Sequence, residues 1–599
     1  MSADQEQAKA LFFQGIALFD AADFAGAEAR LRAALAIVPD RPSALSNLAA
    51  ALVKQDKLAE AVEVASRATA IDPAGAVAWV TLAGALTRLR RREEALAAAE
   101  GAVTAAPQSA TALMARASTY GELRDYARAI ADYEAAYAIN PNEAGLLGLL
   151  LAAKMHACEW RGIEALAAEL LAGIRADTAT ADPFALLAVP QATARDHLLC
   201  ARATIRREAP PQPAFAATAA YRHERLRIAY VSGDYFRHAT THLMSGVFEH
   251  HDRERFEITG VSFGPDDGSP ERTRVVSAFD RFLDVRDLGP RQVAELIRRH
   301  EIDVAVDLGA FTSGGRLSIF APRPAPVQAT YLGYPGTTAA PYVDYIIADA
   351  IVLPPDSNGD FTEKVATLPD SYQANDDAQP IAATPTRAEA GLPANGFVFA
   401  SFNNVYKIAP AVFDRWMQML DAVPSSVLWL LETNAGAAGN LRREAAARGI
   451  DPRRIVLAPQ LSRPEHLARQ RLADLFLDTL PYNAHTTASD ALWAGLPIVT
   501  CTGATFASRV AASLLTAVGL PELVTHSLDD YEALALRLAR EPAELAALKA
   551  KLASNRTTTP LFDTAAITRH LEQAYATMVE RHRRGEPPAA FVVPGEVGG

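Results

Sequence analysis

Small residues and prolines recur at an interval of 34 positions over the first 141 residues. Each repeat carries a proline near its end, two alanines and one further small residue at equivalent places. Small side chains let paired helices approach closely, and a proline ends the helix before the next repeat. The pattern predicts four stacked helical hairpins over residues 8–143. The four sets are Pro39, Pro73, Pro107 and Pro141; Ala27, Ala61, Ala95 and Ala129; Ala34, Ala68, Ala102 and Ala136; and Gly15, Ala49, Ala83 and Ala117.

Residues 144–224 keep helix-length apolar patterning but lose the proline register. GLLGLLLAAKMHACEW and RGIEALAAELLAGI predict helices that cap the repeats. Pro210, Pro211 and Pro213 then predict a linker. This region is therefore expected to be a helical cap followed by a connection to the next domain.

From Leu226 onward, short apolar runs alternate with helix-length stretches, which is typical of a doubly wound α/β domain. Runs that begin at Leu226, Phe256, Ile302 and Val343 predict the strands of one such domain over residues 225–372.

A second alternation over residues 396–582 predicts another α/β domain, whose strands are FVFASFNN, VLWLLE, RIVLAP, LADLFLDT and PIVTC. Its last segment, residues 561–582, predicts a closing helix, and residues 583–599 are expected to be a mobile tail. The predicted fold class is therefore an α-solenoid followed by two Rossmann-like α/β domains. Neither domain carries GxGxxG or GxxxxGK(S/T), which disfavours dinucleotide dehydrogenases and P-loop NTPases.

The bulk composition limits the classes of partner that the chain is expected to bind. The chain has 599 residues and a formal net charge of −12, which supplies no basic surface for nucleic acid or an anionic membrane. It has no run of about 20 apolar residues and no signal-peptide pattern. Cys158, Cys200 and Cys501 lack CxxC spacing, which indicates neither a disulfide framework nor a zinc site. These features predict a cytoplasmic protein with no nucleic-acid or membrane partner.

The stretch LFLDTLPYNAHTTASDALWAG, from Leu475, predicts a strand, a loop and a helix that begins near Thr486. Loops at the carboxyl ends of parallel strands face the ligand crevice, and the free N–H groups of a helix start favour phosphate. His485, Thr486 and Thr487 lie at that point, so a nucleotide phosphate is the expected ligand. The alternative is that Thr486 only caps the helix and Asp490 is a solvated first-turn acid.

The chain resembles the O-GlcNAc transferase/SPINDLY family of tetratricopeptide glycosyltransferases. The 34-residue period resembles the tetratricopeptide repeat. The α/β part resembles the family in the ordered segments LRIAYVSGDYFRHATTHLM, FGPDDGS, RPAPVQATYLGYPGT, VDYIIAD, FNNVYKI, VLWLLE, LDTLPYNAHTTASDALWAGLPIVT and FASRVAASLL. The resemblance implies a GT-B arrangement and inverting transfer of a sugar from a nucleotide donor to Ser or Thr of a protein, without a metal or other cofactor. The concave face of the repeats is expected to bind the protein acceptor; the alternatives are that the repeats brace the next domain or form a homo-oligomer.

The resemblance also implies roles for individual residues on the donor side. Lys407 matches a lysine that contacts the donor pyrophosphate, and His485, Thr486 and Thr487 match a phosphate-contacting turn. His466 and Arg469 match positions around the base and ribose, Asp490 matches an acid on the ribose, and Asn404 stands where animal members carry glutamine. Taken alone, Lys407 would be a solvated lysine, and His466 and Arg469 would be surface residues of a helix.

On the acceptor side, His238 matches a histidine proposed as general base, a role that suits a neutral imidazole. The loop of Gly333, Tyr334, Pro335, Gly336 and Thr337 matches one that lines the sugar and acceptor site, although its glycines and proline would also suit a plain turn.

Departures from the animal enzymes bear on the donor. Tyr482 replaces a smaller residue near the N-acetyl group, and Arg281 replaces a histidine; bulk or charge beside the sugar would change which substituents fit. UDP-GlcNAc is the default donor, with GDP-fucose or a CMP-activated nonulosonic acid as alternatives and flagellin as a candidate acceptor. A catalytically silent scaffold is the hypothesis from another class.

Overall fold

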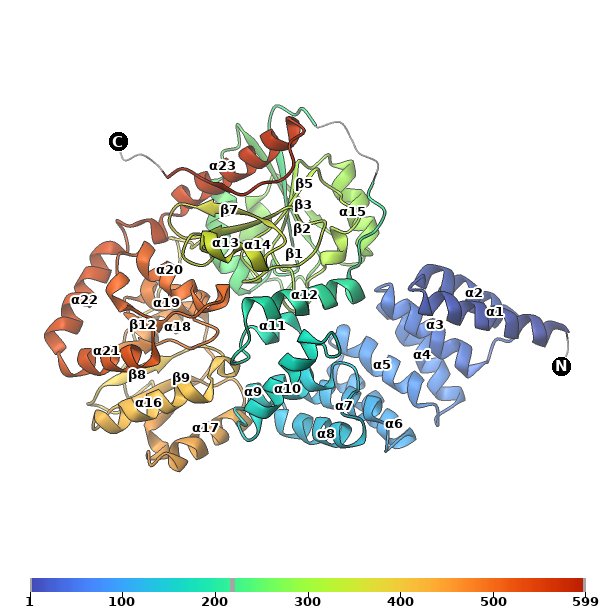
Figure 1. Cartoon of the computed structure of the whole chain (residues 1–599), viewed down its shortest axis with the longest axis horizontal. Helices are drawn as coiled ribbons and strands as arrows, with labels where there is room; N and C mark the ends of the chain where they lie inside the picture. The colour runs from blue at the N-terminus through green and yellow to red at the C-terminus, as the bar shows by residue number, and fades with distance from the viewer. Residues whose placement is uncertain (1–2, 216–220, 596–599) are drawn as a thin grey trace. The chain divides into compact units, whose positions relative to one another are not determined.

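The computed structural model describes residues 3–215 and 221–595 of the chain (Figure 1). It comprises two compact units, residues 1–159 and residues 160–599. The first unit is entirely helical over the residues described, and the second contains both β-sheets.

The first unit is an array of antiparallel helices joined by short turns, which confirms the predicted helical hairpins. The first hairpin begins at Ala3, five residues before the predicted start. The helices are α1 Ala3–Asp20, α2 Phe24–Ile37, α3 Pro42–Lys54, α4 Leu58–Ile71, α5 Ala76–Arg88, α6 Arg92–Ala105, α7 Ala110–Glu122, α8 Tyr126–Ile139 and α9 Leu146–Ala157. Helix α9, predicted as part of the cap, belongs to this unit.

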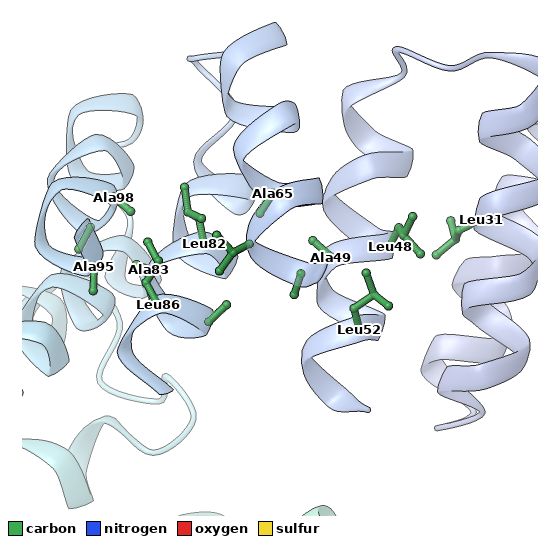
Figure 2. Packing of buried hydrophobic residues seen from close by; sticks show 14 residues of the cluster. Leu31, Leu48, Ala49, Leu52, Ala65, Leu82, Ala83, Leu86, Ala95 and Ala98 are labelled. Atoms are coloured by element: carbon green, nitrogen blue, oxygen red, sulfur yellow. The ribbon is translucent and has the colours of Figure 1, made fainter. Parts of the chain in front are cut away.

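The repeating small residues lie at the helix contacts, as the pattern predicts. Ala27, Ala61 and Ala95 are fully buried. A Cβ atom added to Gly15 would lie 2.8 Å from Leu31 Cγ, so a side chain there would require the leucine to move. Figure 2 shows the resulting core, in which leucines of successive repeats pack against alanines of their neighbours.

The turn inside each hairpin also repeats. Ala22, Asp56, Arg90 and Arg124 all have positive φ, between 59° and 63°, and are 34 residues apart. In each turn the next residue donates its backbone N–H to a carbonyl five residues earlier, as from Lys57 to Leu52. This is the hydrogen bond of a Schellman-type helix end, formed here without glycine.

The second unit begins with α10 Ile163–Arg175, α11 Pro183–Leu186 and α12 Ala194–Glu208. Two parallel sheets follow within the described residues. The first has the order β14-β7-β6-β5-β4-β1-β2-β3, and the second β10-β9-β8-β11-β12-β13. These sheets confirm two doubly wound α/β domains.

The first sheet contains every strand predicted for its domain and several that were missed. Its strands are β1 Leu226–Ser232, β2 Phe256–Ser262, β3 Arg281–Asp284, β4 Val304–Asp307, β5 Val327–Thr330, β6 Tyr345–Asp349, β7 Lys364–Leu368 and β14 Phe591–Val592. Its helices are α13 Ala239–His250, α14 Pro270–Ala278 and α15 Pro290–Arg299. The sequence pattern did not predict β3, β5, β7 or β14.

The second sheet contains all five predicted strands and the short β13. Its strands are β8 Val398–Ser401, β9 Val427–Leu431, β10 Ile455–Ala458, β11 Leu475–Leu477, β12 Ile498–Cys501 and β13 Val524–Thr525. Its helices are α16 Pro410–Ala422, α17 Ala435–Ala447, α18 Arg463–Gln470, α19 Thr486–Ala494, α20 Val510–Ala517, α21 Leu528–Arg540 and α22 Pro542–Asn555. Because β8 and β11 are neighbours, the loops after them lie side by side.

The last helix, α23 Thr564–Arg583, packs on the first α/β domain, beside α13 and β7 (Figure 1). Its assignment to the second domain was therefore wrong. Glu572 accepts hydrogen bonds from His251 Nδ1 at 2.9 Å and from the Asp252 amide at 2.8 Å. His251 Nε2 in turn accepts from the Tyr230 hydroxyl at 2.8 Å. A buried acid that satisfies two donors of the first domain fixes the helix there.

The predicted mobile tail is also partly wrong. Phe591–Val592 form β14, which pairs in parallel with β7 and extends the first sheet. The pairing gives this segment backbone partners that its sequence did not indicate. Residues 596–599, which the tail prediction also covers, lie outside the described residues.

No helix among the described residues has the length and apolar character needed to span a bilayer.

We expect Glu572→Met to destabilise the second unit by about 2–4 kcal/mol, because it leaves two buried donors without an acceptor. Urea unfolding followed by fluorescence would show the transition at lower denaturant. Glu580→Met, the same change at an exposed position of α23, is the control. Equal effects of the two substitutions would contradict this role for Glu572.

Candidate active site

The loop between β11 and α19 is built around the buried carboxylate of Asp478. Its Oδ1 accepts from the backbone amides of Thr479 at 2.7 Å and Ala484 at 2.6 Å, and its Oδ2 accepts from Thr500 Oγ1 at 2.6 Å. Burial raises the pKa of Asp478 to about 6, against the opposing effect of these hydrogen bonds. The acid folds the loop back so that α19 starts beside the end of the strand. The sequence marked Asp478 only as the end of a strand.

Helix α19 starts where the sequence predicts, and its N-cap residue is His485 rather than Thr486. Among the described residues, no side chain caps this end. The His485 ring donates from Nε2 to the Ala507 carbonyl at 3.1 Å, and burial holds its pKa well below the usual range. Thr487 Oγ1 donates to Asn403 Oδ1. The first N–H groups of α19 therefore form a potential anion site, and Thr486 is not the cap.

Lys407 lies beside this helix start, at the end of the 3₁₀ turn Val405–Lys407 after β8. It is 8% exposed, and its Nζ donates to the Asn483 carbonyl at 3.0 Å. Burial lowers the pKa of Lys407 to about 7, although Asp478 opposes the shift. The alternative of an ordinary solvated lysine is wrong, because the ammonium group is held inside the loop that begins α19.

Tyr482 covers Lys407. The centroid of its ring lies 3.5 Å from Lys407 Nζ, a cation–π contact, and 4.8 Å from the ring centroid of His485. Phe184 of α11 packs against the other ring edge, with the centroids 5.9 Å apart. A role for Tyr482 beside the donor sugar stays a prediction, but its contacts already make it part of the lysine's surroundings.

His466 and Arg469 lie together on α18, as expected, but in different environments. Arg469 is 2% exposed and donates from Nε and Nη2 to His466 Nδ1, at 3.1 and 2.7 Å. Because the guanidinium only donates, Nδ1 is the acceptor and the neutral His466 ring carries its proton on Nε2. Burial, and then Arg469, lowers the pKa of His466 to about 3. Arg469 is thus not a surface residue; it orients His466 as a hydrogen-bond donor.

Asp490 is paired with Arg463, which the sequence analysis missed. Arg463 Nη2 lies 2.6 Å from Asp490 Oδ1, and Nη1 lies 3.2 Å from Oδ2. Burial raises the pKa of Asp490, and Arg463 opposes that shift. The alternative of a solvated first-turn acid is therefore wrong.

Asn404 is exposed at the start of the turn that carries Lys407, and its carbonyl accepts the Lys407 amide at 3.0 Å. The buried neighbour Asn403 makes the loop contacts, because its Nδ2 donates to Thr479 Oγ1 at 2.8 Å. Asn403 was missed; its position next to a predicted site residue was the only sequence signal.

His238 lies on the first domain, at the carboxyl side of β1, and is the N-cap of α13. Its Nδ1 accepts from the Thr240 amide at 3.3 Å and lies 3.7 Å from Asp234 Oδ2. With Nδ1 used as an acceptor, the neutral ring carries its proton on Nε2 and donates there. A general-base role at Nε2 requires the other tautomer, with Nδ1–H turned toward Asp234.

The loop Gly333, Tyr334, Pro335, Gly336 and Thr337 is a buried turn at the carboxyl end of β5. Thr337 Oγ1 donates to Glu363 Oε2 at 2.6 Å, and the Tyr334 hydroxyl donates to the Pro183 carbonyl at 3.4 Å. A Cβ added to Gly333 would lie 2.1 Å from the Leu308 carbonyl oxygen, so close backbone approach explains this glycine. Contact with sugar or acceptor stays a prediction. Glu363, which anchors the loop, was missed.

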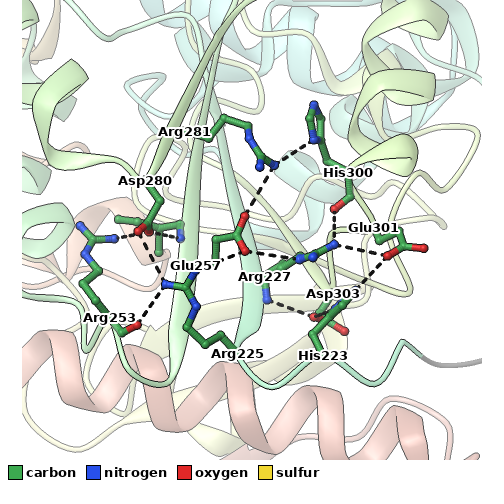
Figure 3. A network of polar contacts seen from close by, with 11 residues as sticks. His223, Arg225, Arg227, Arg253, Glu257, Asp280, Arg281, His300, Glu301 and Asp303 are labelled. Carbon is green, nitrogen blue, oxygen red and sulfur yellow. Dashed lines mark hydrogen bonds and ion pairs between the residues drawn. The ribbon is translucent and has the colours of Figure 1, made fainter.

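Arg281 does not lie at this site. It begins β3, at the amino end of the sheet, and its Nη1 donates to His300 Nδ1 at 2.9 Å and lies 3.6 Å from Glu257 (Figure 3). The network in Figure 3 continues through Arg227 and Glu301 at the same edge. The site residues follow the carboxyl ends of the strands, so the expected effect of Arg281 on the donor sugar was wrong.

The structure thus gathers Lys407, Tyr482, His485, Thr486 and Thr487 around one helix start, with the α18 and Asp490 pairs on the same domain. His238 and the 333–337 loop lie at the carboxyl edge of the other sheet. Among the residues described, no group of three or more His, Cys, Asp or Glu side chains could hold a metal ion.

Comparisons with known proteins identify the family of the chain. The model of Glycosyl transferase family 41 matches residues 188–384 and 374–571, and tetratricopeptide repeat models match residues 18–74 and 80–144. The chain belongs to glycosyl transferase family 41. This confirms the resemblance to the O-GlcNAc transferase/SPINDLY family and the glycosyltransferase class.

Two relatives and one solved structure illustrate the family 41 likeness. The probable UDP-N-acetylglucosamine–peptide N-acetylglucosaminyltransferase SEC of Arabidopsis thaliana is 39% identical over 62% of this chain and 39% of its own. The UDP-N-acetylglucosamine–peptide N-acetylglucosaminyltransferase of Caenorhabditis elegans is 30% identical over 61% of this chain and 41% of its own. The chain thus spans about two fifths of these relatives.

The structure of a lysine-to-methionine variant of Thermobaculum terrenum O-GlcNAc transferase matches with a TM-score of 0.64 and 27% identity, over 98% of this chain and 99% of that one. This match, together with the two parallel sheets, confirms the GT-B fold class for this member of family 41.

We expect Arg281→His to leave the affinity for UDP unchanged within about twofold, because the residue lies at the opposite edge of the sheet from the site. Isothermal titration with UDP would measure it, with Lys407→Met as the variant that should lose affinity. A tenfold loss in Arg281→His would contradict the placement of this residue outside the donor site.

Proposed function

We propose that the chain is an inverting protein O-glycosyltransferase that moves GlcNAc from UDP-GlcNAc to Ser or Thr of a protein. The observation that carries the proposal is the buried ammonium of Lys407 beside the uncapped start of α19. Both groups present positive charge to one point at the carboxyl edge of a Rossmann-like sheet. The names of the relatives supply the donor to test first.

The leaving group determines what this site has to do. The acceptor oxygen forms a bond to the anomeric carbon as the bond from that carbon to the diphosphate breaks, and its electrons leave with the diphosphate. Negative charge therefore grows on the diphosphate in the transition state. Lys407 and the α19 amides would stabilise that charge in a largely desolvated site. We propose that no metal or other cofactor is needed, because these groups supply the positive charge.

In this proposal α18 and Asp490 of α19 bind the nucleoside. His466 offers a fixed Nε2–H donor to a base carbonyl, and Asp490 offers carboxylate oxygens to ribose hydroxyls. Thr486 and Thr487 supply amides to the phosphates. Asn404, exposed beside Lys407, adds an amide group at the same opening.

The acceptor hydroxyl must lose its proton. His238 would take it if its Nδ1–H turned to Asp234, 3.7 Å away, which would leave Nε2 free to accept. In the tautomer that the Thr240 contact implies, the ring would instead orient the acceptor or donor by hydrogen bonding. The loop 333–337 would form the neighbouring wall.

The repeat unit would select the protein acceptor, since stacked helical hairpins offer an extended surface for a peptide segment. Flagellin is one candidate acceptor, and self-association through the repeats is the competing role. We also propose a cytoplasmic location, supported by three buried cysteines without a disulfide.

Intact-mass measurement tests the function. The full chain is incubated with UDP-, GDP- and CMP-sugars and an acceptor panel that includes flagellin, in parallel samples with EDTA and with added Mg²⁺. We expect a gain of one N-acetylhexosamine from UDP-GlcNAc. Removal of residues 1–159 should reduce protein modification more than donor hydrolysis. Transfer from a GDP- or CMP-sugar only would contradict the proposed donor, and a requirement for metal would contradict the proposed leaving-group chemistry.

Lys407 should make the reaction sensitive to pH. Its pKa of about 7 means that the charged form is lost as pH rises above 7, so kcat/KM should fall there. Bound diphosphate stabilises the ammonium, so kcat should fall only at higher pH. Lys407→Arg, which stays charged, should lower the rate but remove the fall in kcat/KM.

Lys407→Met should lower transfer by about 10²–10³-fold, the range found when one charge-stabilising donor is removed from an active site. The same assay measures it, and an unchanged circular-dichroism melting curve would show that the fold is kept. Robust transfer by the Met variant would exclude a leaving-group role for Lys407.

A further inference from the structure

Gln379 contacts three elements that carry candidate site residues. It lies in the segment that connects the two α/β domains, between β7 and β8. Its Oε1 accepts from Arg463 Nε of α18 at 2.9 Å, and its Nε2 donates to the His242 carbonyl of α13 at 3.2 Å. Its own carbonyl accepts from Trp493 Nε1 of α19 at 3.1 Å.

The chemistry of the partners fixes the orientation of the amide. A guanidinium only donates, so the atom facing Arg463 must be the amide oxygen. A backbone carbonyl only accepts, so the amino group must face His242. In the flipped orientation the amino group would face the N–H groups of Arg463, donor against donor. The amide oxygen would face the His242 carbonyl, acceptor against acceptor. The side chain therefore has one satisfied arrangement.

The contacts continue in both directions. Toward the donor side, Arg463 Nη2 donates to Asp490 Oδ1 at 2.6 Å. Toward the acceptor side, the His242 amide donates to the His238 carbonyl at 3.1 Å, within the first turn of α13. A continuous chain of hydrogen bonds thus runs from the second domain to the first, and we call it the relay. Its members are Asp490, Arg463, Gln379, His242 and His238.

The charge of Arg463 also acts on a residue of α13. The pKa of His242 is lowered to about 3, first by burial and then by the positive charge of Arg463.

We propose that Gln379 is a positioning residue that sets the first turn of α13, and with it His238, relative to the nucleoside-binding face at Asp490. This inference rests on the proposed function for its catalytic readout. The side-chain amide of Gln379 connects the two domains within the relay, because it bonds to Arg463 of α18 and to the His242 carbonyl of α13. Its loss would leave donor binding in place and misplace the acceptor-side histidine, and small misplacements of reacting groups are costly.

Two substitutions separate positioning from structural support. Gln379→Met keeps the length of the side chain and removes both hydrogen bonds. Gln379→Glu keeps an acceptor for Arg463 and turns this hydrogen bond into an ion pair, but it has no N–H for the His242 carbonyl. A purely structural residue would tolerate Glu, since the pair with Arg463 becomes stronger.

We expect both variants to lower kcat for transfer by about tenfold, the effect of losing the hydrogen bond to the His242 carbonyl that both substitutions remove, with UDP affinity within about twofold of the wild type. The ratio of donor hydrolysis to transfer should rise. Wild-type transfer by Gln379→Glu would overturn the proposal, as would a parallel loss of UDP binding and transfer.

Gln373→Met is the matched control. Gln373 lies in the same connecting segment and donates to Ser489 Oγ of α19 at 2.7 Å, but makes no contact with α13 among the hydrogen bonds of the described residues. This variant should lower the melting temperature without changing the ratio of hydrolysis to transfer.

Hydrogen–deuterium exchange gives a readout that does not depend on activity. Amides of residues 238–246 should exchange about tenfold faster in both Gln379 variants than in the wild type or Gln373→Met. If the wild type transfers no sugar, the proposed function fails and exchange still tests the relay. Unchanged exchange in both Gln379 variants would overturn it.

Discussion

The candidate site on the second α/β domain depends on one buried carboxylate. Asp478 stands at the end of β11, where desolvation disfavours its charge, and it is kept there by two backbone amides and the Thr500 hydroxyl. Those bonds bend the chain so that α19 begins with free amides at the strand's end. They also bring the Asn483 carbonyl to Lys407. An apolar residue at this position would leave the amides of Thr479 and Ala484 without their acceptor.

Much of the fold follows from periodicity, and the failures have identifiable causes. The 34-residue period and the apolar runs predicted the helical hairpins and nine strands. β5 was missed because Gln328 and Thr330 are polar yet buried: Gln328 Nε2 donates to the carbonyls of Phe320 and Tyr342. Polar residues whose partners lie elsewhere in the chain look like loop residues in a hydropathy pattern. β14 is two residues long and is defined by its partner β7.

The candidate site shows the same limit. Lys407 and the 485–487 turn were predicted because their motif is contiguous and falls where a strand gives way to a helix. Arg463 and Glu363 were missed because their roles come from pairing with residues 27 and 26 positions away, Asp490 and Thr337. Arg281 was misplaced because it lies in none of the matching segments and β3 itself was not predicted, so the sequence did not show that this residue begins a strand. The local sequence pattern predicts which loop holds candidate site residues. The polar pairs that hold this site in place are formed by tertiary packing, which the local pattern does not show.

The crossing of α23 and β14 back to the first domain bears on how the chain acquires its structure during synthesis. The outer edge of β7 pairs with β14, and the donors of His251 and Asp252 bond to Glu572. These partners lie more than 220 residues downstream and are synthesised later. The second α/β domain has its own strands complete by Thr525, so it can close before the first domain is finished. Until residue 592 leaves the ribosome, the outer edge of β7 has no neighbouring strand. His251, which is buried in the finished fold, stays exposed until α23 has been made. The domain made first is thus the last to be completed, because α23 and β14 are synthesised after all the strands of the second domain.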